Sequence, residues 1–519
     1  MLILPTDRQS EALDTKVAKP GIGVEKPSGS NTETIARIQS LYDEGMFTRA
    51  YTEAAPLGPL QHWQGTEARV LAGRLASQLS SDRLGDALVL RAWRADRAVP
   101  AAVLYGSMVM HSIRGTLAAL DMLDASGILL SDNPLRWDAT AYAAYLHGCY
   151  RDFETAELMI NQALEKSGTP WIWSQRAALY EMDDRYEDAL EAAKYALKLN
   201  PRSRTAIQYT SRFYSLFERD EEAMNTLSDA LKLIESPRIA AQLANLEIEH
   251  GQFEKALATL NHFDQLALIK DKRTHSWLAG RRCDIYSHMG DNQRALEQAR
   301  FSTAGFYKKI AERLERATPA SRRVMLPVGF VRQHHMTCAP ATISALSRYW
   351  SKPADHLELA EAICYDGTPH HSQRIWANEH GWHVREFTAD WETSRALIDA
   401  GIPFTLSTVH PGSAHLQAVI GYDMARGVLF IRDPYDRTHT EFAEKAFFES
   451  YASSGPRGMA MVPDEVRARL DALDLPDAAL HDLAQEIQSA LLVHDRQRAE
   501  TACDTLEQSA PGHRLAMTF

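Results

Sequence analysis

Most of the chain places its apolar residues with the spacing of one face of an α-helix. This pattern begins near residue 33 and continues to about residue 316, and almost none of that stretch reads as strand. Residues 1–32 lack the pattern and are rich in Pro, Gly, Ser, Thr and charge, a composition typical of a flexible tail. We therefore predict a flexible start followed by an all-α region, an α-solenoid over residues 33–318.

Within this region the sequence repeats itself about every 34 residues. One small residue per repeat marks the period, with steps of 33, 34 and 33 residues: Ala156, Ala189, Ala223 and Ala256. Such a period is the signature of tetratricopeptide repeats, in which helical hairpins stack into a superhelix. The aromatic positions keep the spacing of core residues, so we interpret them as packing. The concave face of the superhelix is then the expected docking surface for a polypeptide.

Residues 324–463 show a different pattern, with short apolar runs that predict strands. The runs at residues 416–421 and 428–432 each read as a buried strand. Pro340, followed by Ile343 and Leu346, predicts a helix that begins near Cys338. Residues 464–519 return to the helical pattern and predict a further repeat, truncated if the chain is a fragment of a longer protein. The expected fold class is therefore multidomain, with an all-α tetratricopeptide superhelix plus an α+β domain.

Cys338 is the most informative residue of the α+β segment. A thiol at the start of a helix lies in the positive field of the helix dipole, which favours the reactive thiolate. His415 begins one predicted strand and Asp433 directly follows the next. Neighbouring strand ends would let the carboxylate orient one imidazole nitrogen while the other faces the thiol. Asp423 and Asp436 are alternatives to Asp433 for the orienting role.

Several motifs, in this order, resemble those of the C39-like cysteine peptidases, which are papain-fold domains. The resemblance covers about residues 326–463 and rests on Gln333, Cys338-Ala339-Pro340-Ala341, Ala400-Gly401-Ile402-Pro403, Ala414-His415, Gly421-Tyr422-Asp423 and Asp433-Pro434. It implies a papain-like cysteine peptidase domain in which Cys338 is the nucleophile, His415 the general base and acid, and Asp433 the orienting residue. It also implies that Gln333 donates a hydrogen bond to the oxyanion.

Two positions depart from the family pattern. Gln333 stands five residues before the cysteine, whereas the family's glutamine commonly stands six before it, where this chain has Arg332. Ala339 takes the place of the glycine that often follows the nucleophile. The sequence also has no ATP-binding cassette motif, unlike the transporter-fused members that trim leader peptides, so it gives little support to a leader-peptidase role.

Other candidate ligands and thiols do not form a recognisable pattern. The pairs His334-His335 and His370-His371 lack the spacing of a metal site, because adjacent side chains point in different directions. We therefore expect neither a metal nor a cofactor. The remaining cysteines read as small structural residues: Cys149, Cys283, Cys364 and Cys503.

Composition narrows the functional classes. The formal net charge is -12 and no block of Lys and Arg occurs, which argues against a nucleic-acid partner. No apolar run reaches the roughly 18 residues that a membrane span requires, so no span is expected. Five scattered cysteines argue against a disulfide framework and favour a reducing, cytoplasmic location.

Together these features predict a cysteine peptidase that hydrolyses a peptide bond in a polypeptide recruited by the flanking repeats. Two alternatives remain open at this point. The same triad could transfer an acyl or peptidyl group to an amine instead of to water. The papain-like domain could also be a catalytically idle module in a protein-interaction scaffold.

Overall fold

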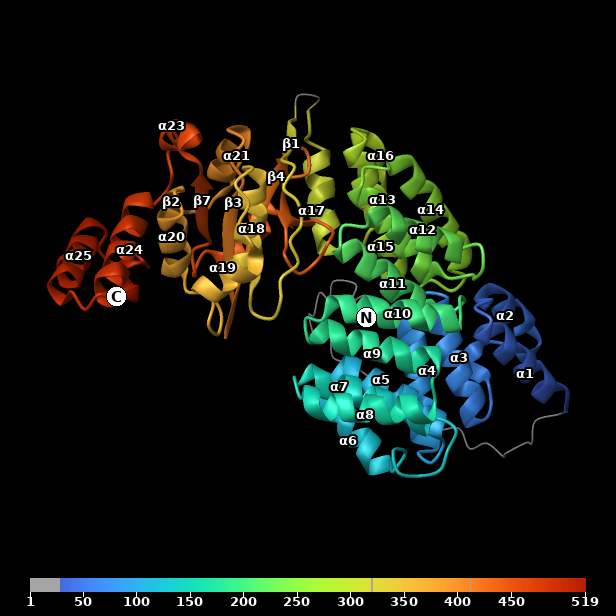
Figure 1. The fold of residues 1–519 in the computed structure, drawn as a ribbon. Helices are drawn as coiled ribbons and strands as arrows, with labels where there is room; N and C mark the ends of the chain where they lie inside the picture. The colour runs from blue at the N-terminus through green and yellow to red at the C-terminus, as the bar shows by residue number, and fades with distance from the viewer. Residues whose placement is uncertain (1–28, 319–320, 411) are drawn as a thin grey trace.

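The computed structural model describes residues 29–318, 321–410 and 412–519. The predicted tail lies outside this range up to residue 28, and residues 29–32 belong to the first helix, α1 (Gly29–Asp43), which begins earlier than predicted. In Figure 1 a helical array, coloured blue to yellow-green, lies beside a sheet domain, and a last helical hairpin in red lies beyond the sheet. The predicted fold class, helical repeats plus an α+β domain, is confirmed.

The array consists of antiparallel helical hairpins that stack in sequence order. Thr169, Ser203 and Ser236 explain where three of the helices begin, because each side chain accepts a hydrogen bond from the backbone N–H three residues later. The small residues that mark the sequence period are fully buried, as hairpin packing requires. The elements are α1, α2 (Phe47–Glu53), η1 (Ala55–Leu57), η2 (Leu60–His62), α3 (Thr66–Gln78), α4 (Asp82–Ala95), α5 (Pro100–Arg114), α6 (Thr116–Ser126), α7 (Arg136–Cys149), α8 (Phe153–Lys166), α9 (Pro170–Met182), α10 (Tyr186–Leu199), α11 (Arg204–Leu216), α12 (Asp220–Ala230), α13 (Pro237–Glu249), α14 (Phe253–Leu266), α15 (Lys272–His288), α16 (Asn292–Phe301) and α17 (Gly305–Leu314).

The array curls back so that its first helices meet helices much later in the chain, as the blue and green ribbons of Figure 1 indicate. The Glu235 carboxylate, between α12 and α13, accepts from Thr48 N at 3.0 Å and from Arg49 Nε at 2.9 Å. The Thr274 hydroxyl of α15 donates to the Ser80 carbonyl at 2.9 Å. These contacts close the array into a ring. We call the space inside the ring, lined by the inner helices α7, α9, α11, α13 and α15, the lumen.

The other large part of the chain is built on a seven-stranded antiparallel sheet in the order β2-β7-β3-β4-β5-β6, with β1 paired to the end of β4. The predicted strands at 416–421 and 428–432 are confirmed as β4 and β5, and β4 extends further in both directions. One face of the sheet packs on α18 and on α17 of the array, and the other packs on α21 and α22. The elements are β1 (Arg323–Met325), α18 (Cys338–Tyr349), α19 (His356–Ile363), α20 (His370–Glu379), β2 (His383–Thr388), α21 (Trp391–Asp399), β3 (Phe404–His410), β4 (Ser413–Asp423), β5 (Val428–Arg432), β6 (Thr440–Ala443), α22 (Glu444–Tyr451) and β7 (Arg457–Val462).

The residues after the sheet are helical, as predicted. Asp477, at the start of α24, accepts from the Thr388 hydroxyl of β2 at 2.6 Å, which fixes the last hairpin to the edge of the sheet. Among the described residues, no helix combines the length and apolar character that crossing a bilayer requires. The elements are η3 (Asp464–Val466), α23 (Arg467–Asp471), α24 (Ala478–Leu492), α25 (Arg496–Ser509) and η4 (Ala516–Thr518).

Candidate active site

Cys338 is the first residue of α18, where the free backbone N–H groups and the helix dipole favour an anion. The turn before it places Met336 in the left-handed region, with φ at 61°, so the chain reverses sharply just ahead of the thiol. One turn further along, the Thr342 hydroxyl donates to the Leu416 carbonyl at 3.0 Å. This bond fixes α18 against β4, the strand that carries His415.

His415 and Asp433 lie at neighbouring ends of the paired strands β4 and β5, where the sequence predicts them. His415 Nε2 lies 3.0 Å from Asp433 Oδ1, and the same oxygen accepts from Tyr435 N at 2.8 Å. The carboxylate holds Nε2, which leaves Nδ1 free of that bond. The imidazole also interacts with the Cys338 thiol, because each group shifts the pKa of the other.

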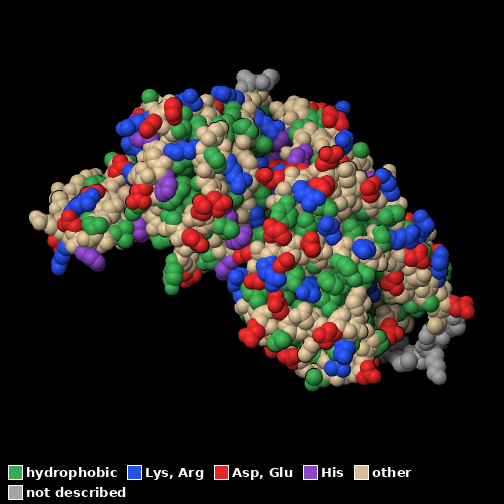
Figure 2. All heavy atoms as spheres, in the orientation of Figure 1, with side chains coloured by type: hydrophobic (Ala, Val, Ile, Leu, Met, Phe, Trp, Pro, Cys, Tyr) green, Lys and Arg blue, Asp and Glu red, His purple; other side chains and the backbone are tan. Residues whose placement is uncertain are grey.

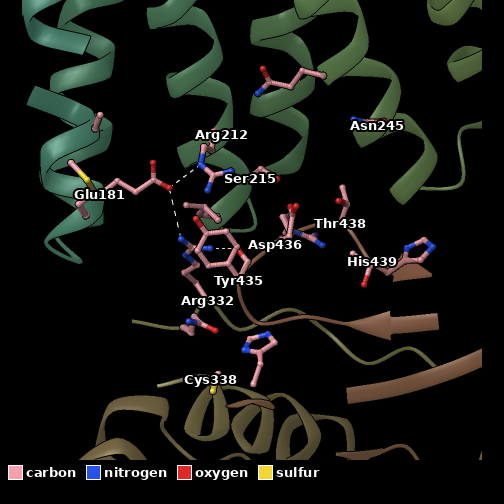
Figure 3. A pocket seen from close by; sticks show the side chains of 18 of the residues that line it. Glu181, Arg212, Ser215, Asn245, Arg332, Cys338, Tyr435, Asp436, Thr438 and His439 are labelled. Atoms are coloured by element: carbon pink, nitrogen blue, oxygen red, sulfur yellow. Dashed lines mark hydrogen bonds and ion pairs between the residues drawn. The ribbon is translucent and has the colours of Figure 1, made fainter. Parts of the chain in front are cut away.

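The two alternative carboxylates are engaged elsewhere. Asp423 lies at the far end of β4, where its Oδ1 accepts from Arg426 N at 3.1 Å. Asp436 lies on the array side of the cavity, close to Arg212 (Figure 3). Of the three candidates that the sequence offers, Asp433 is thus the carboxylate placed to orient the imidazole.

Opposing effects set the charges of the thiol and the imidazole. Burial alone raises the pKa of Cys338, but hydrogen bonds from His415 and from Leu416 N outweigh it, so this pKa is lowered. Burial alone lowers the pKa of His415, but its bonds to Asp433 and Cys338 raise this pKa to about 10. Both shifts favour a thiolate facing an imidazolium over the neutral pair, and this ion pair is the form that a cysteine nucleophile requires.

Gln333 lines the same cavity as Cys338. Its backbone N–H donates to the Pro434 carbonyl at 2.9 Å, and its carbonyl accepts from the Tyr186 hydroxyl of α10 at 3.2 Å. Its side-chain Oε1 is buried without a hydrogen-bond partner among the described residues. The backbone at this position is thus fixed by both the sheet domain and the array, while the amide oxygen is not used in a structural bond.

Comparison with known families concerns the segment that carries these four residues. Residues 325–459 match the Peptidase_C39 like family. Among solved structures, the chain is similar to the peptidase domain of Streptococcus ComA, a bifunctional ABC transporter involved in quorum sensing. The two are 20% identical, and the match covers 26% of this chain and 99% of that one, with a TM-score of 0.23. No curated protein matches the chain.

The array has solved counterparts of its own. It is similar to a tetratricopeptide repeat protein from Parabacteroides merdae, with 15% identity and a TM-score of 0.30. That match covers 47% of this chain and 95% of the other. We refer to residues 325–459 below as the C39-like segment, and all four predicted site residues lie within it.

Arg332, which occupies the usual glutamine position of the C39-like pattern, is used to dock the array. Its guanidinium donates to the Tyr435 carbonyl and to the Tyr186 hydroxyl, and it lies 3.9 Å from Glu181 of α9. Figure 3 shows this group of side chains on the array side of Cys338. The one-residue shift of the glutamine therefore coincides with an arginine that bridges the two parts of the molecule.

A buried ionic interface also joins the C39-like segment to the array. Glu249, at the end of α13, lies 2.8 Å from Arg432 and 2.7 Å from His439, and all three side chains are almost inaccessible. Burial alone raises the pKa of Glu249, but these bonds lower it to about 2. Arg437 pairs with Asp220 of α12 at 2.7 Å. The array thus holds the loop of residues 433–439, which begins with Asp433.

Arg426, in the turn between β4 and β5, is the centre of a second buried cluster. Its guanidinium has no exposed surface, lies 2.6 Å from Asp284 of α15 and is also bonded to Glu441. The Tyr307 hydroxyl of α17 donates to the Asp284 carboxylate at 2.8 Å. This cluster fixes β4 and β5 to the end of the array.

The structure brings together a possible set of metal ligands that the sequence analysis did not single out. Ligand atoms of His288, His439 and Glu441 lie within 4.8 Å of one another. However, Arg426 is bonded to Glu441 and Arg323 to His288, so two guanidinium groups lie where they would repel a cation. The residues present fit an ionic network rather than a metal site.

The histidine pairs of the sequence do not converge on one another. His334 packs edge-on against Tyr186 and His356, with ring centroids 5.4 Å and 5.3 Å away. His370 and His371 begin α20. The described neighbours of His334 are thus aromatic rings, which suit packing between the array and the segment.

Sequence reasoning missed the contribution of the array to this site. Tyr186 shares its repeat position with Phe153 and Phe253, so the period predicts packing there. In the fold its hydroxyl contacts the segment that precedes Cys338, and neighbouring Asp184 accepts from a backbone N–H of the same segment at 2.8 Å. The signal is absent from the local sequence, because these bonds join residues 147 and 151 positions apart.

The site opens into a large cavity of about 2550 Å³, whose walls come from both the C39-like segment and the lumen. Figure 3 shows Cys338 at one side of this cavity, facing side chains of the inner array helices across it. On the face shown in Figure 2, acidic, basic and apolar side chains are interspersed, without a broad field of one charge. A ligand of Cys338 therefore meets residues of both parts of the molecule at once.

Proposed function

We propose that this chain is a cysteine peptidase, in which Cys338 attacks a peptide bond of a polypeptide held by the helical array. The observation that carries the proposal is the hydrogen bond between Asp433 and His415, next to a thiol at a helix N-terminus whose pKa His415 lowers. The match of residues 325–459 to a peptidase family supports the same reaction class. The array and its shared cavity support a polypeptide as the substrate.

In this mechanism the Cys338 thiolate forms a bond to the carbonyl carbon, and the carbonyl electron pair moves to oxygen. The oxyanion accepts from the Cys338 backbone N–H and from the Gln333 amide. As the C–N bond breaks, the His415 imidazolium gives its proton to the leaving nitrogen. His415 then takes a proton from water, whose oxygen attacks the acyl carbon and releases the acid and the free thiolate.

Selective alkylation tests the reactive state of the thiol. With iodoacetamide at mildly acidic pH, Cys338 should react first, because its pKa is lowered. Burial raises the pKa of Cys149 and Cys503, and raises that of Cys283 to about 12. As pH rises, the difference in alkylation rate between Cys338 and the other cysteines should shrink, because the other thiols begin to ionise. Peptide mass mapping of the alkylated sites at several pH values measures this order.

The same experiment separates an enzyme from an idle scaffold. Denatured protein, in which every thiol is equally exposed, is the control. Equal and slow labelling of Cys338 and the other cysteines in the folded chain would contradict an activated thiolate and favour the scaffold alternative.

Replacement of Asp433 by asparagine tests the orienting role. The neutral amide no longer stabilises the imidazolium, so kcat should fall by a factor on the order of 10² to 10⁴. Hydrolysis of a quenched-fluorescence peptide library measures the loss. Asp436→Asn is the matched control, since it makes the same change in the same loop, and its loss should be far smaller. If the two variants lose activity equally, Asp433 is not the specific orienting group.

A further inference from the structure

The lumen is bordered by the inner helices of the array and is continuous with the space in front of Cys338. Its closure depends on contacts such as those of Glu235 with α2, which make the concave surface a ring rather than an open groove. The cavity that the lumen shares with the space before Cys338 measures about 2550 Å³ in all, which admits an extended chain but not a folded domain. The shape of the lumen therefore selects for an unfolded segment.

One row of the lumen wall is formed by glutamines at equivalent positions of three successive repeats. Gln175, Gln208 and Gln242 are 33 and 34 residues apart, on α9, α11 and α13. All three line the cavity, and Gln175 and Gln242 are only 5% and 9% exposed. A side chain with both a donor and an acceptor thus recurs along the inner surface with the period of the array.

Two amides of this surface hold unsatisfied acceptors. Gln242 Nε2 donates to the Gln208 carbonyl at 3.2 Å, but Gln242 Oε1 is buried without a partner among the described residues. One turn along the same helix, Asn245 Oδ1 is buried and likewise unpartnered there. A buried acceptor that lacks its hydrogen bond is destabilising by about 1–3 kcal/mol, so these oxygens favour a ligand that brings N–H donors.

The spacing of the row fits an extended peptide. Neighbouring helices pack about 8–10 Å apart, and an extended chain advances about 3.4 Å per residue. One glutamine therefore meets the peptide backbone about every three residues. Each peptide residue other than proline offers one backbone N–H and one C=O. A row of glutamine amides therefore binds an extended chain through its backbone, whatever its side chains are.

Beside the middle glutamine of this row lies Arg204, a positive charge with no ion pair among the described residues. Arg204, the first residue of α11, lines the cavity, and its recorded bond is to the Gln208 amide oxygen rather than to a carboxylate. The nearby Arg238 already pairs with Asp82, and Lys272 and Arg273 begin the next inner helix. Burial, followed by the charge of Arg238, lowers the pKa of Arg204 to about 10, an effect that a bound anion would relieve.

We propose that the lumen binds an extended peptide segment with acidic side chains, whose backbone contacts the glutamine row and whose charge lies against Arg204. The delivery of this segment to Cys338 rests on the proposed function, but binding itself does not. The substrate class is thus an unfolded polypeptide with acidic residues on one side of the cleaved bond.

Binding is measured on the full chain carrying Cys338→Ala, which removes any contribution of cleavage. The probes are two fluorescein-labelled peptides of about 12 residues, roughly 40 Å long when extended, identical except that one carries four glutamates and the other four lysines. By fluorescence anisotropy, the glutamate peptide should bind at least about tenfold more tightly. Adding Arg204→Gln should reduce that preference by about tenfold or more, because a charge-assisted hydrogen bond is lost.

Further variants separate the glutamine row from the charge. Gln175→Leu and Gln242→Leu should each weaken the glutamate peptide at least several-fold while keeping its advantage over the lysine peptide. Lys198→Gln and Gln162→Leu, on the exposed outer helices α10 and α8, are the matched controls and should change neither. Circular dichroism of each variant shows whether it is folded. Because two glutamine variants are made, the test can still be read if one of them does not fold.

Equal binding of the two peptides, no binding of either, or an unchanged preference in Arg204→Gln would overturn this proposal. None of these results would contradict the proposed peptidase activity, because the alkylation of Cys338 tests that proposal without a peptide. Conversely, if Cys338 is unreactive but the glutamate peptide binds tightly, the proposed binding site in the lumen stands and the proposed peptidase function is refuted.

Discussion

Replacement of Cys338 by alanine is expected to abolish hydrolysis, with a loss of kcat on the order of 10⁴ to 10⁶. The reason is that no other group in the site can form the acyl intermediate, so removing the nucleophile removes the pathway. Initial rates on a quenched-fluorescence peptide library, with and without the substitution, measure the loss. The thiol is small and only partly buried, so the thermal unfolding midpoint should shift by no more than a few degrees.

Cys503→Ala is the matched control, since it removes a thiol from α25, on the opposite side of the sheet from the array. It should retain full activity. Hydrolysis that persists in Cys338→Ala but disappears in a second preparation purified by another route would indicate a contaminant. Hydrolysis that persists in every preparation of Cys338→Ala would refute the proposed mechanism.

The substitution Arg426→Met should have the largest effect on stability. It leaves the carboxylates of Asp284 and Glu441 in a buried site without their shared cation. Breaking such a cluster by removing one partner costs about 3–5 kcal/mol. Urea unfolding followed by circular dichroism should therefore show a transition at clearly lower urea concentration. The proposed peptidase activity should fall as well, since the turn that carries Arg426 joins β4, which carries His415, to β5, which leads into Asp433.

Two further variants sharpen this test. Arg496→Met removes an exposed arginine that pairs with Glu500 on the surface, and the unfolding midpoint should stay where it is. Adding Asp284→Asn and Glu441→Gln to Arg426→Met should recover part of the loss, because the uncompensated charges are gone. A midpoint in Arg426→Met equal to that of the parent protein would show that the cluster does not stabilise the fold.

The elements that local pattern dictates could be predicted from the sequence. Ala156 and its equivalents reveal the helical repeats because close helix packing requires small residues at a fixed period. The position of His415 and Asp433 follows from two short apolar runs, since the ends of adjacent strands lie side by side. Cys338 could be placed at a helix start from the proline and the apolar spacing behind it.

The contacts between distant parts of the chain could not be predicted in this way. Glu235 meets Thr48, and Tyr186 meets Gln333, across 187 and 147 positions of sequence. Nothing in either local sequence records such a partner, because the same residues would suit an exposed surface or an ordinary repeat core. Only the three-dimensional structure therefore shows the closure of the ring, the buried interface between the array and the C39-like segment, and the bonds between the array and the loop of residues 433–439.

The loop that begins with Asp433 is bonded both to the candidate active site and to the helical array. Its first residue is bonded to the His415 imidazole, while Arg437 and His439 a few positions later are bonded to Asp220 and Glu249 of the repeats. The C39-like segment excised from this chain would expose Arg432 and Arg437 to water without their carboxylate partners, close to Asp433. The repeats are thus not an interchangeable adaptor, and a foreign array in their place would disturb the surroundings of Asp433 and His415.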